Sequence, residues 1–112
     1  MIDEFLVQNL SKISKACEKN GVAKLYAFGS IVDGRFVHGK SDIDLLVEFP
    51  ENQQDKKANS KNLLLLWMEL QGILETKVDL VTTDTIKGEH FKKYLELYKE
   101  LIYEKKSEYH RL

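Results

Sequence analysis

The stretch that decides the fold is Ser41-Asp42-Ile43-Asp44-Leu45-Leu46-Val47, in which two acids lead into a run of branched apolar residues. Such a run is typical of a buried strand. Side chains alternate between the two faces of a strand, so Asp42 and Asp44 are predicted to point the same way, with Cα atoms roughly 6.5–7 Å apart. Ile43 and Leu45 then point toward the core on the opposite face.

Two carboxylates held this close repel each other, and burying them without partners is costly. A bound divalent cation removes that cost. Mg²⁺ prefers hard oxygen ligands, takes one or two carboxylates and completes its shell with water and substrate phosphates. The pair Asp42 and Asp44 therefore predicts a metal site at the start of the strand.

A third acid, Asp79, lies within the apolar segment Lys77-Val78-Asp79-Leu80-Val81. If this segment forms a strand beside the first one, all three carboxylates could converge on two metal ions about 3.5–4 Å apart. Such a site activates an attacking hydroxyl and stabilises a leaving pyrophosphate.

Upstream, the apolar segment 22–28 predicts a buried strand that runs into Gly29-Ser30 and then a short helix. A glycine lets the backbone approach a phosphate closely, and amides at a helix N-terminus bind anions. The Ser30 hydroxyl can add a hydrogen bond to the same oxygens.

Each of these features has an ordinary explanation when taken alone. Gly-Ser after a strand is commonly a turn with a helix cap, Asp-x-Asp is common on surface loops, and Asp79 could cap a neighbouring element. Three such features in this order, each at a strand edge, favour a functional site over three coincidences.

The remaining elements alternate between helix and strand, which predicts an α/β (α+β) fold with helices packed on a small sheet. Apolar spacing predicts three amphipathic helices, and the polar segment after Pro50, Glu51 to Asn62, is expected to be a surface loop. The apolar positions of the three helices are Leu6, Leu10, Ile13 and Cys17; Leu63, Leu66, Trp67, Leu70, Ile73 and Leu74; and Phe91, Tyr94, Leu95, Tyr98, Leu101 and Ile102.

The bulk properties limit the classes of function. With 112 residues the chain is expected to form a single domain over 1–112, and its one cysteine, Cys17, excludes an internal disulfide and a multi-cysteine zinc site. A net charge of -1 gives no broad surface for nucleic acid. No apolar run is long enough to cross a bilayer and no secretory signal is visible, so a cytoplasmic location is expected.

Taken together, Gly29-Ser30, the block 41–47 and Val78-Asp79-Leu80-Val81 resemble the minimal nucleotidyltransferases of the DNA polymerase β superfamily over about residues 22–81. The resemblance implies a small mixed β-sheet flanked by helices. It also implies ATP as nucleotide donor, two Mg²⁺ ions, and transfer of a nucleotide to a hydroxyl.

The same resemblance implies individual roles. Asp42 and Asp44 would bind both metal ions, and Asp79 would bind the catalytic metal and help to deprotonate the incoming hydroxyl. Gly29 and Ser30 would hold the β- and γ-phosphates.

The resemblance also implies a partner. Single-domain members often act as antitoxins beside a helical HEPN-family toxin, and some add AMP to a tyrosine of that toxin. This chain looks like that type because no extra domain for another acceptor is visible. Two alternatives remain: an idle module that neutralises a partner by contact, and an enzyme that modifies a small molecule such as an aminoglycoside. The oligomeric state stays open, a homo-oligomer included.

The loop between Ser30 and Asp42 departs from the family pattern. Many relatives carry an arginine near the position of Asp33, whereas the first arginine here is Arg35, and the loop is about one residue longer than usual. Arg35, together with His38 and Lys40, either lines the nucleotide phosphates or forms a solvated loop rim.

Overall fold

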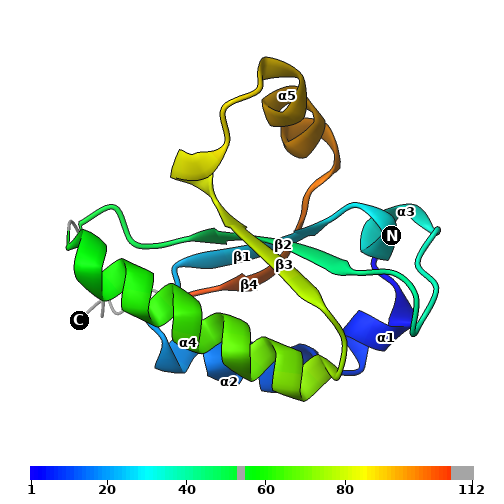
Figure 1. Ribbon diagram of the computed structural model, residues 1–112, viewed down its shortest axis with the longest axis horizontal. Helices are drawn as coiled ribbons and strands as arrows, with labels where there is room; N and C mark the ends of the chain where they lie inside the picture. The colour runs from blue at the N-terminus through cyan, green and yellow to red at the C-terminus, as the bar shows by residue number, and fades with distance from the viewer. Residues whose placement is uncertain (53–54, 107–112) are drawn as a thin grey trace, which may run out of the picture.

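The structure, a computed structural model, describes residues 1–52 and 55–106 and contains a small sheet with helices on both faces (Figure 1). Residues 53–54 and 107–112 lie outside the described part. The elements are α1 (Glu4–Val7), α2 (Leu10–Lys19), β1 (Lys24–Phe28), α3 (Ser30–Asp33), β2 (Ile43–Glu48), α4 (Lys56–Leu74), β3 (Val78–Thr82), the 3₁₀ helix η1 (Thr83–Thr85), α5 (Glu89–Tyr98) and β4 (Glu100–Glu104).

The sheet is mixed, with the strand order β3-β2-β1-β4. β1 pairs antiparallel with β2 and with β4, while β2 pairs parallel with β3. The α4 helix makes the crossover that a parallel pair requires, since parallel neighbours cannot be joined by a tight turn. The small mixed sheet flanked by helices that the sequence predicts is therefore confirmed.

Strand alternation divides the sheet into two unequal faces. On one face Leu25, Ile43, Leu45 and Val78 pack against α2 and α4 in the main core. The other face holds a much smaller cluster, in which Phe28, Leu46 and Leu95 are buried and α5 is the only covering helix among the described residues. Figure 1 shows α2 and α4 on one side of the sheet and α5 standing apart on the other.

The N-terminal helix is interrupted, contrary to the single helix predicted from its apolar spacing. α1 ends at Val7 and α2 begins at Leu10. The side-chain amide of Asn9 donates a hydrogen bond of 2.9 Å to the carbonyl oxygen of Phe5, so a side chain competes with the backbone at the break. Cys17 is fully buried on α2, and burial raises the pKa of its thiol to about 12, which confirms that it packs in the core.

The helix α4 begins earlier than the sequence pattern suggests, so the predicted loop over 51–62 is wrong from Lys56 onward. The Asp55 carboxylate caps the helix by accepting hydrogen bonds from the amides of Lys57 and Ala58, at 3.0 and 3.1 Å. The buried positions are Leu66, Leu70 and Leu74. Trp67, expected in the core, is 37% exposed, but its indole N–H donates to the Val78 carbonyl at 2.9 Å and ties α4 to β3.

The last predicted helix is also wrong in its final turn. α5 ends at Tyr98, and Leu101 and Ile102 belong to β4, which pairs with β1 at the edge of the sheet. A short apolar pair fits either periodicity, and pairing with β1 decides for the strand. Of the two tyrosines predicted on its apolar side, Tyr94 is half-buried, whereas Tyr98 is 59% exposed.

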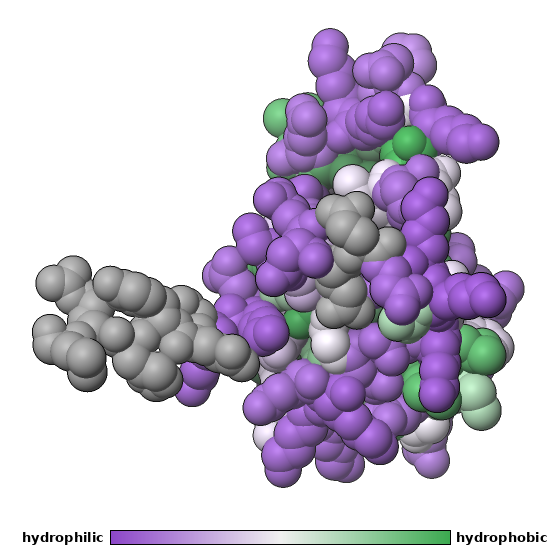
Figure 2. Space-filling model, turned by 90° about the vertical axis from the view of Figure 1, so that its left-hand side faces the viewer, coloured by the Kyte–Doolittle hydropathy of each residue, from purple (hydrophilic) through white to green (hydrophobic). Residues whose placement is uncertain are grey.

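No helix in the described ranges is long and apolar enough to cross a bilayer. Figure 2 shows one side of the molecule as mainly hydrophilic, with hydrophobic residues gathered under the uppermost part, which α5 forms.

The main core depends on the buried side of α4, which can be tested on one helix. Leu70→Ala removes a fully buried side chain and is expected to lower the free energy of unfolding by about 2–5 kcal/mol in urea titrations. Leu64→Ala, at a position that is 56% exposed, is the control and should change it by no more than about 0.5 kcal/mol. Equal losses would contradict this packing.

Candidate functional site

Two acids meet on the thinly covered face of the sheet. Asp44 of β2 and Asp79 of β3 are direct partners in the parallel register. On its other side Asp44 pairs with Phe28, the last residue of β1 before Gly29. Because Ile43 and Leu45 are buried in the main core, strand alternation puts the Asp44 side chain on the α5 face. The two strands therefore lie side by side, which is the condition for their acids to converge.

Asp42 lies one residue before β2 and is exposed. Its carboxylate forms an ion pair with the Lys77 ammonium group, at 3.6 Å from Nζ to Oδ2. Lys77 directly precedes β3, so the two residues face each other where the parallel strands begin. Within residues 1–52 and 55–106, no three His, Cys, Asp or Glu side chains form a group that could hold a metal ion. Binding of metal ions by Asp42, Asp44 and Asp79 therefore remains a prediction.

Electrostatics nevertheless single out Asp44. Desolvation by burial raises its pKa most, and the negative charges of Asp79 and Asp42 raise it further, to about 6. Both neighbours are thus close enough to disfavour a charge on Asp44. A divalent cation would reverse this effect, because it favours the ionised form of every carboxylate around it.

Asp79 differs from expectation in one respect. The sequence suggests a carboxylate surrounded by apolar strand residues, but the side chain is exposed. β3 is an edge strand, and its outer face is not covered at this point. Asp79 is therefore accessible to a ligand. Because the side chain is exposed, the strand can carry this carboxylate without the cost of burying a charge.

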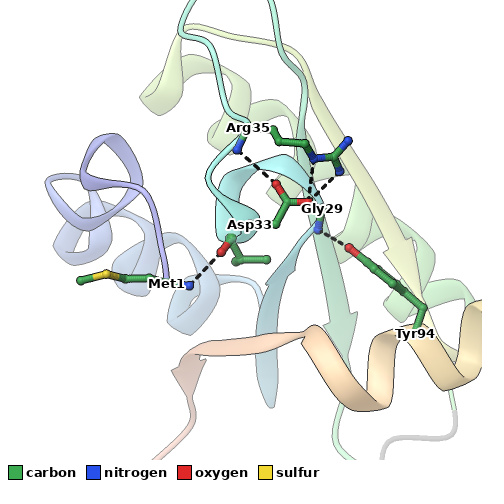
Figure 3. Close-up of polar contacts among 6 residues, drawn as sticks. Met1, Gly29, Asp33, Arg35 and Tyr94 are labelled. Carbon is green, nitrogen blue, oxygen red and sulfur yellow. Dashed lines mark hydrogen bonds and ion pairs between the residues drawn. The ribbon is translucent and has the colours of Figure 1, made fainter.

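Gly29 connects β1 to α3 and lies against Asp44. Its backbone has φ 76° and ψ -148°, a region that is almost restricted to glycine. A Cβ atom at this position would lie 2.5 Å from Oδ2 of Asp44. The Gly29 N–H donates a hydrogen bond of 3.0 Å to the Tyr94 hydroxyl of α5 (Figure 3). Ser30 begins α3, which is a single turn.

The loop that follows α3 holds the basic residues considered above. The Arg35 side chain folds back onto Asp33, with Nη2 2.6 Å from Oδ2 (Figure 3). This hydrogen bond lowers the pKa of Asp33 and raises that of Arg35. His38 and Lys40 are exposed, and the His38 ring packs on Phe5 at 4.5 Å between centroids. Binding of phosphate by Arg35 remains a prediction.

Two residues at this site have no role in the sequence interpretation. Lys77 lies one position before β3, where no local motif marks it, although its ammonium group forms an ion pair with Asp42. Tyr94 is 65 residues from Gly29 in sequence, and helical spacing alone places it only on an apolar stripe. The contact depends on how α5 packs, which no local motif encodes.

Neither of two cavities in the described part of the structure is lined by Asp42, Asp44 or Asp79. One of about 480 Å³ lies between the N-terminus, α3 and α5 and is lined by Val32, Tyr94 and Leu97 among others. Another of about 550 Å³ lies at the far ends of β2 and β3. Asp44 and Asp79 instead lie on neighbouring strands at the sparsely covered face of the sheet.

The close approach of Gly29 to Asp44 predicts a specific loss of stability. Gly29→Ala combines a glycine-only backbone conformation with a clash at Asp44, so the free energy of unfolding should fall by about 1–3 kcal/mol. Gly34→Ala is the control, because Gly34 also has a positive φ of 87° but open space around its Cβ position. In urea titrations Gly29→Ala should lower the free energy of unfolding more than Gly34→Ala does. Equal losses would contradict the close approach of Gly29 to Asp44.

The raised pKa of Asp44 predicts a pH-dependent stability. Its pKa rises from 3.8 in the unfolded chain to about 6, so the folded state binds more protons between these values and is stabilised as the pH falls through them. Asp44→Asn should therefore be more stable than the parent at pH 7.5, with the difference disappearing near pH 4. Urea titrations at both pH values measure this. Asp84→Asn, on η1, is the control for the loss of one negative charge. If the stability difference between Asp44→Asn and the parent does not vary with pH, the raised pKa of Asp44 is contradicted.

Comparisons with known proteins agree with this geometry. The family model described as "Polymerase beta, Nucleotidyltransferase" matches residues 11–108. The "Putative protein adenylyltransferase MJ1379" of Methanocaldococcus jannaschii is 36% identical over 86 residues, which cover 77% of this chain and 80% of that protein.

Solved structures share the fold. A chain from the crystal structure of a toxin-antitoxin with AMP-PNP superposes with a TM-score of 0.64 at 25% identity, covering 87% of this chain and 74% of the other. A structure described as a "putative minimal nucleotidyltransferase" gives a TM-score of 0.63 at 24% identity, covering 89% and 95%. Since the family model spans most of the chain and the M. jannaschii relative is 36% identical across 77% of it, the protein belongs to the polymerase β nucleotidyltransferase family and is a nucleotidyltransferase.

Proposed function

We propose that the protein is a Mg²⁺-dependent adenylyltransferase that transfers AMP from ATP to a hydroxyl of a protein partner, namely a tyrosine of a HEPN-type toxin. The observation that carries the proposal is the position of Asp44, which has Asp79 in register on one side and Gly29 against its carboxylate on the other. Two carboxylates that could bind metal and a glycine that could lie close to a phosphate are thus neighbours on the sparsely covered face of the sheet.

The donor set suits Mg²⁺. Two carboxylates are what this ion usually takes from a protein, and Asp44 and Asp79 supply them from adjacent strands. Asp42 would join them by giving up its exposed ion pair with Lys77, which costs little because exposed pairs contribute about 0–1 kcal/mol. When bound, the metal ions would polarise the phosphates and stabilise the charge that develops on the leaving group.

The residues of the chain divide the remaining work. Gly29 and Ser30 would hold the β- and γ-phosphates, which leaves the α-phosphorus near the acids. The acceptor hydroxyl forms a new P–O bond, the bond to the β-phosphate breaks, and pyrophosphate leaves. Asp79 is exposed at the sheet edge, so it can face an acceptor from another molecule and help to remove its proton.

The choice of acceptor rests on relatives. The M. jannaschii relative is named for adenylyl transfer to protein, and a toxin-antitoxin that was crystallised with AMP-PNP shares the fold. These support ATP as donor and a toxin as partner. Crowding of negative charge at Asp44 argues against an idle binding module, because a surface that only makes contacts gains nothing from it.

The proposal is tested with purified protein, its toxin partner and ATP labelled on the α-phosphate. Label is expected on the toxin only when Mg²⁺ or Mn²⁺ is present. The double variant Asp42→Asn, Asp44→Asn should abolish labelling, because two of the three carboxylates that would bind metal are lost while the side-chain shapes are kept. Glu48→Gln, at the far end of β2 on the same face, should label like the parent.

Unchanged labelling by the double variant would rule out this mechanism. If neither the parent nor any variant labels the toxin, and the toxin is nevertheless neutralised on binding, the idle binding module is favoured. Phosphoamino-acid analysis and replacement of toxin tyrosines by phenylalanine identify the acceptor; label that persists without tyrosine would overturn that part of the proposal.

A further inference from the structure

The hydrogen bond between Gly29 and Tyr94 links the nucleotide site to the least embedded helix. It joins the middle of α5 to the residue that follows β1, 65 positions away in the sequence, with 3.0 Å between the amide nitrogen and the hydroxyl oxygen. The donor is the backbone N–H of Gly29, the residue that lies against the Asp44 side chain. Figure 3 shows the Tyr94 side chain reaching from α5 to this amide.

A backbone amide has a single hydrogen to donate. While Tyr94 accepts it, that hydrogen is not available to a phosphate oxygen. We propose that Tyr94 is a latch on the nucleotide site, whose hydroxyl competes with a nucleotide phosphate for the Gly29 N–H. This inference rests on the proposed function, because it takes Gly29 as a phosphate-binding residue.

The setting of α5 allows the latch to open. Leu95 is its one buried residue, and the cluster beneath it is small. Segments with few buried apolar contacts open locally at low free-energy cost. Tyr94 also lines the cavity of about 480 Å³ beside α3, so the ring has space on that side when the hydroxyl leaves the amide.

The setting also explains why the latch holds without nucleotide. The Tyr94 ring stacks on Phe91 at 6.1 Å and packs on Tyr98 at 5.3 Å between centroids, which fixes its direction. An anionic phosphate oxygen accepts a stronger hydrogen bond than a neutral phenol, so nucleotide displaces the hydroxyl. The competition lowers the apparent affinity for nucleotide and couples binding to movement of the ring.

Tyr94→Phe removes the competing hydroxyl and keeps the ring. Titration calorimetry with AMP-PNP and Mg²⁺ should show a Kd about 2- to 10-fold lower than that of the parent, the value of one net hydrogen bond. Tyr98→Phe removes a hydroxyl from the same helix, one turn away, and should leave the Kd unchanged. In the absence of nucleotide, the Gly29 amide should exchange its hydrogen several-fold faster in Tyr94→Phe than in the parent.

The possible outcomes distinguish failure of the Tyr94 latch from failure of the proposed nucleotide site. If the parent binds AMP-PNP but Tyr94→Phe binds equally or more weakly, the latch is wrong and the nucleotide site stands. If Gly29 exchange is equally slow in Tyr94→Phe, the hydroxyl does not hold the amide and the latch is again wrong. If no variant binds AMP-PNP, both the nucleotide site and the latch fail.

Discussion

The register of β2 against its two neighbours is the constraint on which the site depends. One position of β2, Asp44, lies across from Asp79 on the parallel side and from Phe28 on the antiparallel side. A slip of one residue would send Asp44 into the main core and turn Ile43 or Leu45 toward solvent. Burial of the apolar half of β2 therefore fixes where the acids stand, and no contact among the acids is needed to hold them there.

The two sheet faces show how stability and access are divided. α2 and α4 seal one face, where Leu6, Ile13, Leu66 and Leu70 are fully buried. The other face keeps only a small cluster under α5. A sheet sealed equally on both sides would leave no approach to Asp44 for a nucleotide. The stability of the domain thus comes mainly from one face of the sheet, and the acids of the candidate site lie on the other.

The parts of the fold that could be predicted are those encoded by short-range pattern. Alternation along 41–47 predicts which way Asp44 and Ile43 point, and the apolar frame of Asp79 predicts a strand. The failures occur where a local pattern is ambiguous or overridden. Leu101 and Ile102 fit a helix or a strand, and only pairing with β1 decides. Asp55 is a typical N-cap residue, but it lies in a polar segment whose composition favours a loop.

The site shows the same division. Local sequence locates Gly29, Asp42, Asp44 and Asp79, because each lies at or near the end of a strand that its own neighbours define. Exposure of Asp79, the Lys77 partner of Asp42 and the Tyr94 hydroxyl on Gly29 depend on which strand is at the edge and how α5 docks. These are tertiary facts with no short-range signature.

The negative charges of Asp42, Asp44 and Asp79 repel one another and so destabilise the folded state, but only one of the three has an ion-pair partner within the described ranges. Lys77 pairs with exposed Asp42 at the rim, whereas no ion pair within the described ranges reaches the half-buried Asp44. A lysine next to Asp44 would relieve its repulsion but would also occupy the place of a cation. Because Lys77 pairs with Asp42 and not with Asp44, a local negative potential remains at Asp44, which either a proton or an incoming cation can relieve. The unfavourable environment of Asp44 is thus a physical reason why this face of the sheet would attract a cation.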